Sequence, residues 1–215
     1  MAPRLLVFAD GTETGGGSGF ANLVRRARSG SLDATIVGVV SSHENGGVRG
    51  YADEFNIPFR HMPKWDRTED GYRFLVRFFS SDFVALSGYT KLARGLDPRT
   101  TFNIHPGPLP QFGGKGMHGD HVHEAVLAAY QRGELTHTEV CMHFVTEKYD
   151  EGPVFLRVRI PIHEDDTVET LRTRVNRAEH EWQPKFTRFV MLGLIAWDGI
   201  NPNTLVGSLE FKLAT

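Results

Sequence analysis

The chain has 215 residues, of which 40% are hydrophobic and 23% charged, and its formal net charge is -2. This length fills one α/β core or at most two small domains, and we expect a single domain over residues 1–215. The charge argues against a general nucleic-acid binder, which needs a basic excess to neutralise phosphates. Local basic pockets are still compatible with this net charge.

The cysteine content and the hydropathy bear on the cellular compartment. Cys141 is the single cysteine, so no intramolecular disulfide can form, and its apolar surroundings predict a buried thiol. The apolar run at the N-terminus is too short for a signal peptide, and no stretch approaches the ~20 apolar residues of a membrane span. We therefore expect a cytoplasmic protein without a membrane partner.

Strands and helices alternate through the first half of the chain. Apolar and β-branched runs predict strands at 4–9, 35–40, 58–62, 82–87 and 101–105. Apolar residues at helical spacing predict helices at 18–28, 48–55 and 70–79. This alternation favours an α/β fold with a twisted, mostly parallel sheet and helices on both faces. Ligands of such sheets bind at the carboxyl ends of the strands.

The second half has a different pattern. After a predicted helix at 119–131, residues 138–145 and 154–162 alternate and should pair as an antiparallel extension of the sheet. A last long helix is predicted at 168–195, and Pro184 should kink or break it. Residues 201–215 carry no pattern that assigns them a role.

A glycine-rich segment, residues 14–20, lies between the first strand and the first helix. Consecutive backbone N–H groups and the positive end of a helix can hold a phosphate there. The segment lacks the Lys of a Walker loop and the GxGxxG spacing, so a nucleoside triphosphate site is not expected. A flexible surface loop is the alternative, and the position after the first strand favours phosphate binding.

Asn103 and His105 are the next chemical candidates. Side chains at i and i+2 of a strand point the same way, and the prolines that follow fix the exit of the chain. Asp150 lies in a turn from which its carboxylate could orient the imidazole. Together the three groups suit acyl transfer, in which a carbonyl oxygen gains charge and an amine loses a proton. The alternatives are a structural histidine beside proline and an Asp150 that only forms the turn.

Histidines are also dense at residues 118–123. His118, Asp120, His121 and His123 could suggest a metal, but side chains at 121 and 123 diverge on a helix. We therefore expect no metal site.

Three sequence segments carry a resemblance to a known family. NIHPGPLPQFGGKG from residue 103, HFVTEKYDEGPV from residue 143 and RVNRAEH from residue 174 are similar to the glycinamide ribonucleotide formyltransferases of purine biosynthesis. These belong to the folate-dependent formyltransferase superfamily, and the resemblance extends over about residues 5–184. It implies a Rossmann-like formyltransferase fold, 10-formyltetrahydrofolate as donor and the amine of 5'-phosphoribosylglycinamide as acceptor. It implies no metal, and the oligomeric state stays open.

The resemblance also implies roles for particular residues. The first half, about 1–100, would bind phosphate, and the second half, about 101–200, would bind folate and carry the chemistry. The family usually has Asn where this chain has Gly19, and Arg is common at the place of Lys91. By resemblance the substrate phosphate would be bound by Gly17, Ser18 and Gly19, the rest of the acceptor by Asn176 and Glu179, and the folate by Thr90, Lys91, Leu92, Ala93 and Asn103.

The resemblance leads to a mechanism that needs no covalent enzyme intermediate. His105, held cationic by Asp150, would stabilise the oxyanion and pass a proton to the leaving folate nitrogen. The carboxylate should raise the pKa of His105 by favouring its charged form. Asn103 would donate a hydrogen bond to the formyl oxygen.

Other functions share the same three residues. Formyltransferases that act on a sugar nucleotide or on methionyl-tRNA would also carry Asn103, His105 and Asp150. Those enzymes usually have an additional C-terminal domain, and the tRNA enzyme would want a basic face. A folate- or nucleotide-sensing module without catalysis is the non-enzymatic alternative.

Overall fold

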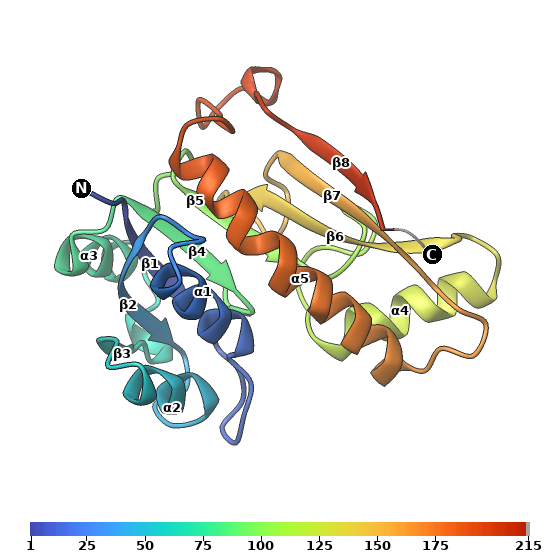
Figure 1. Ribbon diagram of the computed structural model, residues 1–215, viewed down its shortest axis with the longest axis horizontal. Helices are drawn as coiled ribbons and strands as arrows, with labels where there is room; N and C mark the ends of the chain where they lie inside the picture. Colours follow the sequence, from blue (N-terminus) through green and yellow to red (C-terminus); the bar gives the residue numbers. More distant parts are fainter. Residues whose placement is uncertain (214–215) are drawn as a thin grey trace.

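The computed structural model describes residues 1–213, in which eight strands form one sheet flanked by helices (Figure 1). The strands are β1 (Arg4–Phe8), β2 (Thr35–Ser41), β3 (Phe59–His61), β4 (Phe83–Ser87), β5 (Thr101–His105), β6 (His137–Phe144), β7 (Val154–Pro161) and β8 (Leu209–Lys212). The α-helices are α1 (Ser18–Arg28), α2 (Gly47–Glu54), α3 (Glu69–Phe79), α4 (Asp120–Gln131) and α5 (Val168–Met191). Short 3-10 turns occur at Lys64–Asp66 and Pro202–Thr204.

The sheet has the strand order β3-β2-β1-β4-β5-β6-β7-β8. The strands from β3 to β5 pair in parallel, and β6 is antiparallel to both β5 and β7. These pairings confirm the predicted mostly parallel sheet with an antiparallel extension. Strands β2 and β3 lie on one side of β1 and strands β4 and β5 on the other, so the order of strands reverses between β1 and β4. Such a switch point opens a crevice at the carboxyl ends of the strands.

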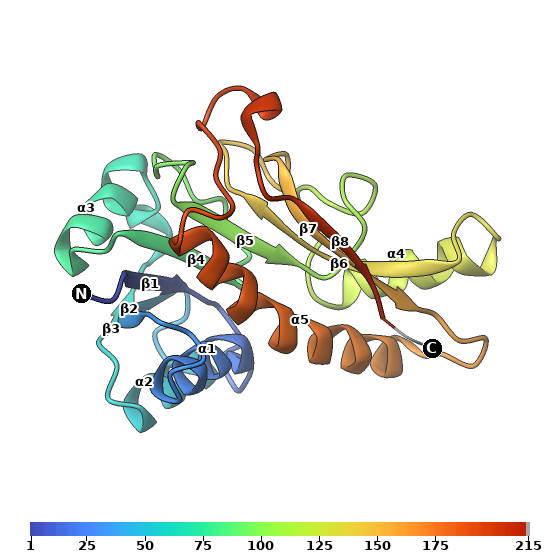
Figure 2. The ribbon, with the colours of Figure 1, turned by 45° about the horizontal axis from the view of Figure 1, so that its top comes forward.

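Two buried clusters hold the helices to the two faces of the sheet. The larger cluster joins one face to α1, α2, α4 and α5, and the smaller one joins the other face to α3. Figure 2 shows α3 on the opposite side of the sheet from α1 and α2. Strand β1 contributes side chains to both clusters, because Leu5 and Val7 face one side of the sheet and Leu6 and Phe8 the other. Helices on both faces are thus confirmed.

The C-terminal segment adds a strand that the sequence pattern did not reveal. β8 pairs in parallel with β7 at the edge of the sheet. Phe211 in β8 packs on Trp182 of α5 with ring centroids 4.5 Å apart. The four residues of β8 alternate between apolar and polar, but a run of four is the shortest that favours a strand.

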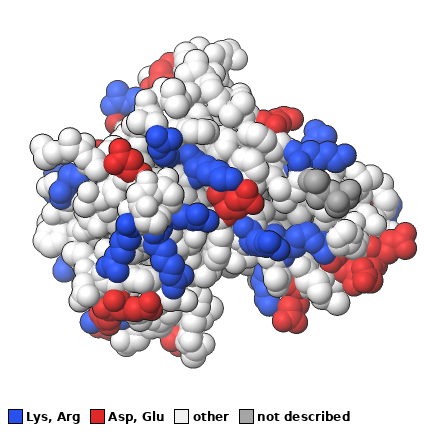
Figure 3. All heavy atoms as spheres, viewed as in Figure 1, with Lys and Arg blue, Asp and Glu red and all other residues white. Residues whose placement is uncertain are grey.

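Cys141 is buried in β6, as predicted, and burial raises the pKa of its thiol to about 12. Within residues 1–213, no helix combines the length and apolar character needed to cross a membrane. On the face shown in Figure 3, basic side chains gather over α1 and α5, with acidic side chains between them.

Helix α5 continues through Pro184, so the break that was one of the two expected outcomes does not occur, and the helix ends at Met191 rather than at residue 195. Proline lacks the N–H that would bond to the carbonyl four residues earlier, that of His180. The amide Nδ2 of Asn22 in α1 donates to this carbonyl oxygen at 2.7 Å. A side chain from a neighbouring helix thus replaces the backbone hydrogen bond that proline removes.

The replacement can be tested with Asn22→Ala. Leaving the partly buried His180 carbonyl unpaired should lower the free energy of unfolding by about 1–2 kcal/mol, measured by urea denaturation. Asn45→Ala, at an exposed position, is the control and should change it by less than about 0.5 kcal/mol. Equal stabilities of the two variants would contradict this role of Asn22.

Candidate active site

A cavity of about 850 Å³ opens at the carboxyl ends of β1, β4 and β5 and is bounded on its far side by α5. Ten of the predicted site residues line it, namely Gly17, Ser18, Gly19, Thr90, Lys91, Asn103, His105, Asp150, Asn176 and Glu179. Leu92 and Ala93 are not among the lining residues. Ala93 is buried in the smaller core cluster, and the carbonyl of Leu92 accepts a hydrogen bond from Tyr72.

The carboxylate of Asp150 is the centre of the polar groups at one end of the cavity. Its Oδ2 accepts a hydrogen bond of 2.9 Å from the N–H of Gly114 and lies 3.8 Å from Nδ1 of His105. Its Oδ1 lies 3.3 Å from Nε2 of His143. Burial alone would raise the pKa of Asp150, but the adjacent imidazoles of His143 and His105 and the N–H of Gly114 outweigh it and lower the pKa. Asp150 therefore stays ionised.

His105 is neutral in the free protein. Its Nε2 donates to the carbonyl of Phe112 at 2.7 Å, which leaves Nδ1 facing Asp150. The residue is only 3% exposed, and this burial lowers the pKa of His105 more than Asp150 raises it. Asp150 thus raises the pKa of His105, as predicted, but burial outweighs this effect, so the prediction that Asp150 holds His105 cationic is wrong.

Asn103 and His143 are cross-strand partners in β5 and β6. His143 donates from Nδ1 to the carbonyl of Phe144 at 2.8 Å, so its Nε2 can accept from Nδ2 of Asn103 at 3.1 Å. The same Nδ2 lies 3.4 Å from Oδ1 of Asp150. The two hydrogens of the Asn103 amide thus face His143 and Asp150. Asn103 can donate to a substrate oxygen only if one of these two contacts breaks.

Sequence reasoning missed His143, although one signal was present. A histidine within an apolar antiparallel strand must find a polar partner, and the register that follows from pairing β5 with β6 sets it opposite Asn103.

The glycine-rich loop brings the backbone of α1 to the other end of the cavity. Gly17 precedes the helix with a left-handed φ of 85°, and a Cβ there would press on Val48 of α2. A side chain at Gly19 would overlap the hydroxyl of Ser87, so Ser87 occupies the space that a larger residue at this position would need. No side chain within the described residues caps α1, and Gly17, Ser18 and Gly19 at the start of this helix line the cavity.

Helix α5 supplies the wall beside this loop. His180 contacts the hydroxyl of Ser18 with Nε2 and Oγ 3.2 Å apart. Asn176 donates to the carboxyl of Glu179 at 3.4 Å. Burial raises the pKa of Glu179 to about 7, and the bond from Asn176 opposes this only in part. The acid form of Glu179 is therefore well populated near neutral pH.

The histidine-rich segment at the start of α4 is divided between the cavity and the surface. His118, Asp120 and His123 line the cavity, and His121 contacts Glu124 on the exposed side of α4. Burial lowers the pKa of His123 to about 4. Within residues 1–213, no three His, Cys, Asp or Glu side chains are grouped in a way that could hold a metal ion.

The raised pKa of Glu179 has a consequence for stability. The folded state favours the protonated acid, so this contribution is fully present below about pH 4.5 and is lost as the pH rises through about 7. Between these two pH values, the free energy of unfolding of the wild type should therefore decrease by at most about 3 kcal/mol. Glu179→Gln should not show this decrease. Urea denaturation at several pH values measures the difference.

Glu181→Gln is the matched control for this measurement. Glu181 lies two residues further along α5, on its exposed side, where it pairs with Lys185. Its variant should follow the wild-type pH dependence. If the free energy of unfolding depends on pH in the same way in the wild type and in Glu179→Gln, the raised pKa of Glu179 is contradicted.

Comparison with known proteins assigns this arrangement to a family. The model of the family described as formyl transferase matches residues 4–187. A Vigna unguiculata protein named phosphoribosylglycinamide formyltransferase, chloroplastic, is 34% identical over 93% of this chain and 67% of its own length. The phosphoribosylglycinamide formyltransferase of Bacillus subtilis is 30% identical over 89% of this chain and 95% of its own.

A solved structure agrees with these sequence matches. Glycinamide ribonucleotide transformylase 1 from Symbiobacterium toebii superposes with a TM-score of 0.78 at 26% identity, with 92% of each chain covered. The chain described here therefore belongs to the formyl transferase family, in its phosphoribosylglycinamide formyltransferase branch.

Proposed function

We propose that the protein transfers the formyl group of 10-formyltetrahydrofolate to the amine of 5'-phosphoribosylglycinamide. The supporting observation is that one cavity is lined at one end by a glycine-rich loop before a helix and at the other by Asn103, His105 and Asp150. The same cavity thus offers one group of residues suited to phosphate binding and another suited to acyl transfer. Both substrates are small molecules, and the free, buried Cys141 is compatible with the reducing cytoplasm that we propose as the site of action.

The acceptor would bind along α1 and α5. The backbone N–H groups of Gly17, Ser18 and Gly19 suit its phosphate, because the helix end carries a partial positive charge. Asn176 and Glu179 face the same part of the cavity and offer polar groups to the remainder of the acceptor.

The donor would bind beside the segment after β4. Thr90 and Lys91 line the cavity there, whereas Leu92 and Ala93 would contribute only through the path of the backbone. Asn103 lines the same cavity, with its Nδ2 3.4 Å from Oδ1 of Asp150, and would contact the formyl group.

The chemistry that we propose starts from neutral His105. The amine attacks the formyl carbon, a new C–N bond forms, and the carbonyl oxygen becomes an oxyanion. Nδ1 of His105 takes the proton that the amine loses, and the resulting imidazolium is stabilised by Asp150 at 3.8 Å. The bond to the folate nitrogen then breaks, and that nitrogen receives the proton. Asn103 donates to the oxyanion once its amide is released from His143 or Asp150.

Formation of the folate product, followed by absorbance, tests this assignment. Glycinamide ribonucleotide should be the accepted amine, whereas a UDP-amino sugar and methionyl-tRNA should give no turnover. Asp150→Asn should lower kcat by about 10²–10³ because the imidazolium loses its counter-charge. Asp97→Asn, in an exposed pair with Arg99, should leave kcat unchanged.

Two outcomes would contradict the proposal. Turnover with another amine but not with glycinamide ribonucleotide would overturn the acceptor. Binding of the donor without turnover of any amine would favour a folate sensor over an enzyme.

A further inference from the structure

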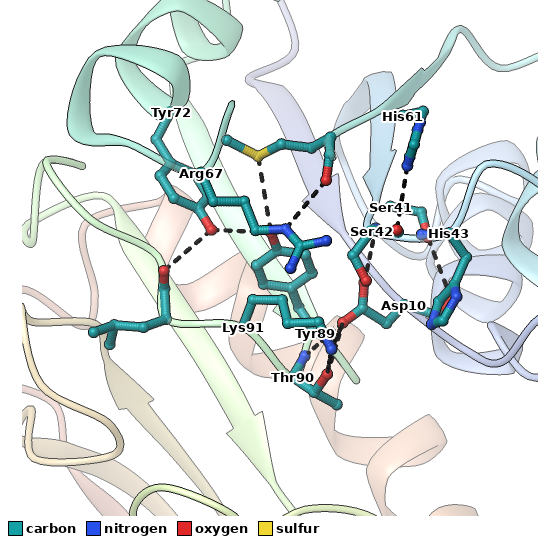
Figure 4. Close-up of polar contacts among 12 residues, drawn as sticks. Asp10, Ser41, Ser42, His43, His61, Arg67, Tyr72, Tyr89, Thr90 and Lys91 are labelled. Atoms are coloured by element: carbon teal, nitrogen blue, oxygen red, sulfur yellow. Dashed lines mark hydrogen bonds and ion pairs between the residues drawn. The ribbon is translucent and has the colours of Figure 1, made fainter. Parts of the chain in front are cut away.

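Asp10 is a buried carboxylate at the carboxyl end of β1 that takes no part in the chemistry proposed above. Only 1% of its surface is exposed, and it lies a few residues before the glycine-rich loop, between this loop and β1. Figure 4 shows its carboxylate between the segment after β2 and the segment after β4. Oδ1 accepts from the N–H of Ser42 at 2.9 Å. Oδ2 accepts from both the N–H and the hydroxyl of Thr90, at 2.9 and 2.8 Å.

The contact continues to the lysine on the cavity wall. Nζ of Lys91 donates to Oγ1 of Thr90 at 2.7 Å and lies 3.7 Å from Oδ2 of Asp10. The Lys91 side chain is about one-third exposed, whereas that of Asp10 is almost completely enclosed. The ammonium is therefore held above a buried negative charge, with the Thr90 hydroxyl bound to both (Figure 4).

The buried charge is stable in this position. Burial alone would raise the pKa of Asp10, but hydrogen bonds with Ser42 and Thr90 outweigh it and lower the pKa. Asp10 is thus an ionised acceptor at neutral pH, and the three hydrogen bonds that its carboxylate accepts come from Ser42 and Thr90, in loops that meet at the switch point.

We infer that Asp10 is a positioning residue for the formyl donor, which fixes Thr90 and Lys91 at the cavity wall through its hydrogen bonds to Thr90. This inference rests on the proposed function, because it takes the segment after β4 as the donor side of the cavity. The geometry supports it in two ways. Thr90 donates two of the three hydrogen bonds that the Asp10 carboxylate accepts, and both Thr90 and Lys91 line the cavity.

The substitution Asp10→Asn tests the inference. Asparagine has one carbonyl oxygen for three donors, so its NH₂ must face either Ser42 or Thr90, donor against donor. We expect KM for 10-formyltetrahydrofolate to rise about tenfold, the equivalent of ~1.4 kcal/mol, because the wall segment shifts. KM for glycinamide ribonucleotide should change less than twofold.

Asp82→Asn is the matched control. Asp82 accepts from the N–H of Arg4 at 2.9 Å and so links β4 to β1 at the opposite end of the same strands, on the surface. This variant should leave both KM values unchanged. If Asp10→Asn lowers the thermal midpoint but leaves KM for the donor within twofold of wild type, Asp10 is only structural and the inference is overturned.

Thr90→Val provides a second test that does not depend on the folding of Asp10→Asn. Valine keeps the shape and the backbone N–H but removes the hydroxyl that joins Asp10 to Lys91. KM for the donor should rise about threefold, and the effects of the two substitutions should be less than additive, because they share one contact. An unchanged KM in Thr90→Val, or strict additivity, would contradict the inference.

Calorimetric binding of tetrahydrofolate separates this inference from the proposed function. If the wild type binds no folate, the proposed function fails. If the wild type binds tetrahydrofolate and Asp10→Asn binds it with the same Kd, only the positioning role fails. A weaker Kd in Asp10→Asn, with Asp82→Asn equal to wild type, supports both.

Discussion

The structure of the site depends on one ionised carboxylate that is largely withdrawn from water. Asp150 meets the backbone of Gly114 and the imidazoles of His105 and His143, which come from three separate segments. Because these contacts offset the cost of burial, the carboxylate keeps its charge. The negative charge of Asp150 beside the neutral imidazole of His105 favours the imidazolium that forms when His105 takes the proton of the amine. The site therefore stabilises a charge that develops only during the reaction.

The sheet topology determines what this charge can act on. The reversal of strand order between β1 and β4 opens the crevice, and the glycine-rich loop and the segment after β4 both begin there. Asp10 links the two sides, since it lies between β1 and the loop and accepts two hydrogen bonds from Thr90. Close packing at Gly17 and Gly19 lets α1 approach the cavity with its N-terminal backbone exposed to it.

Much of this arrangement follows from sequence patterns with a clear physical basis. The alternation of strands and helices predicts the sheet, and strand periodicity places Asn103 and His105 on one face. The charge of His105 could not be predicted, because its sign depends on how completely the fold encloses the ring. The continuity of α5 through Pro184 depends on Asn22, which is 158 residues from the carbonyl it contacts. His143 enters the site through strand register, and the alternating pattern of β8 extends over only four residues.

The protonation state of His105 is the most direct test of how Asp150 and burial act together. Nitrogen-15 NMR of the free protein at pH 7 distinguishes the two ring nitrogens. We predict a proton on Nε2, bound to the carbonyl of Phe112, and none on Nδ1, which faces Asp150. Protonation of both nitrogens at pH 7 would contradict a neutral resting His105, and with it the assignment of Nδ1 as the group that accepts the proton of the amine.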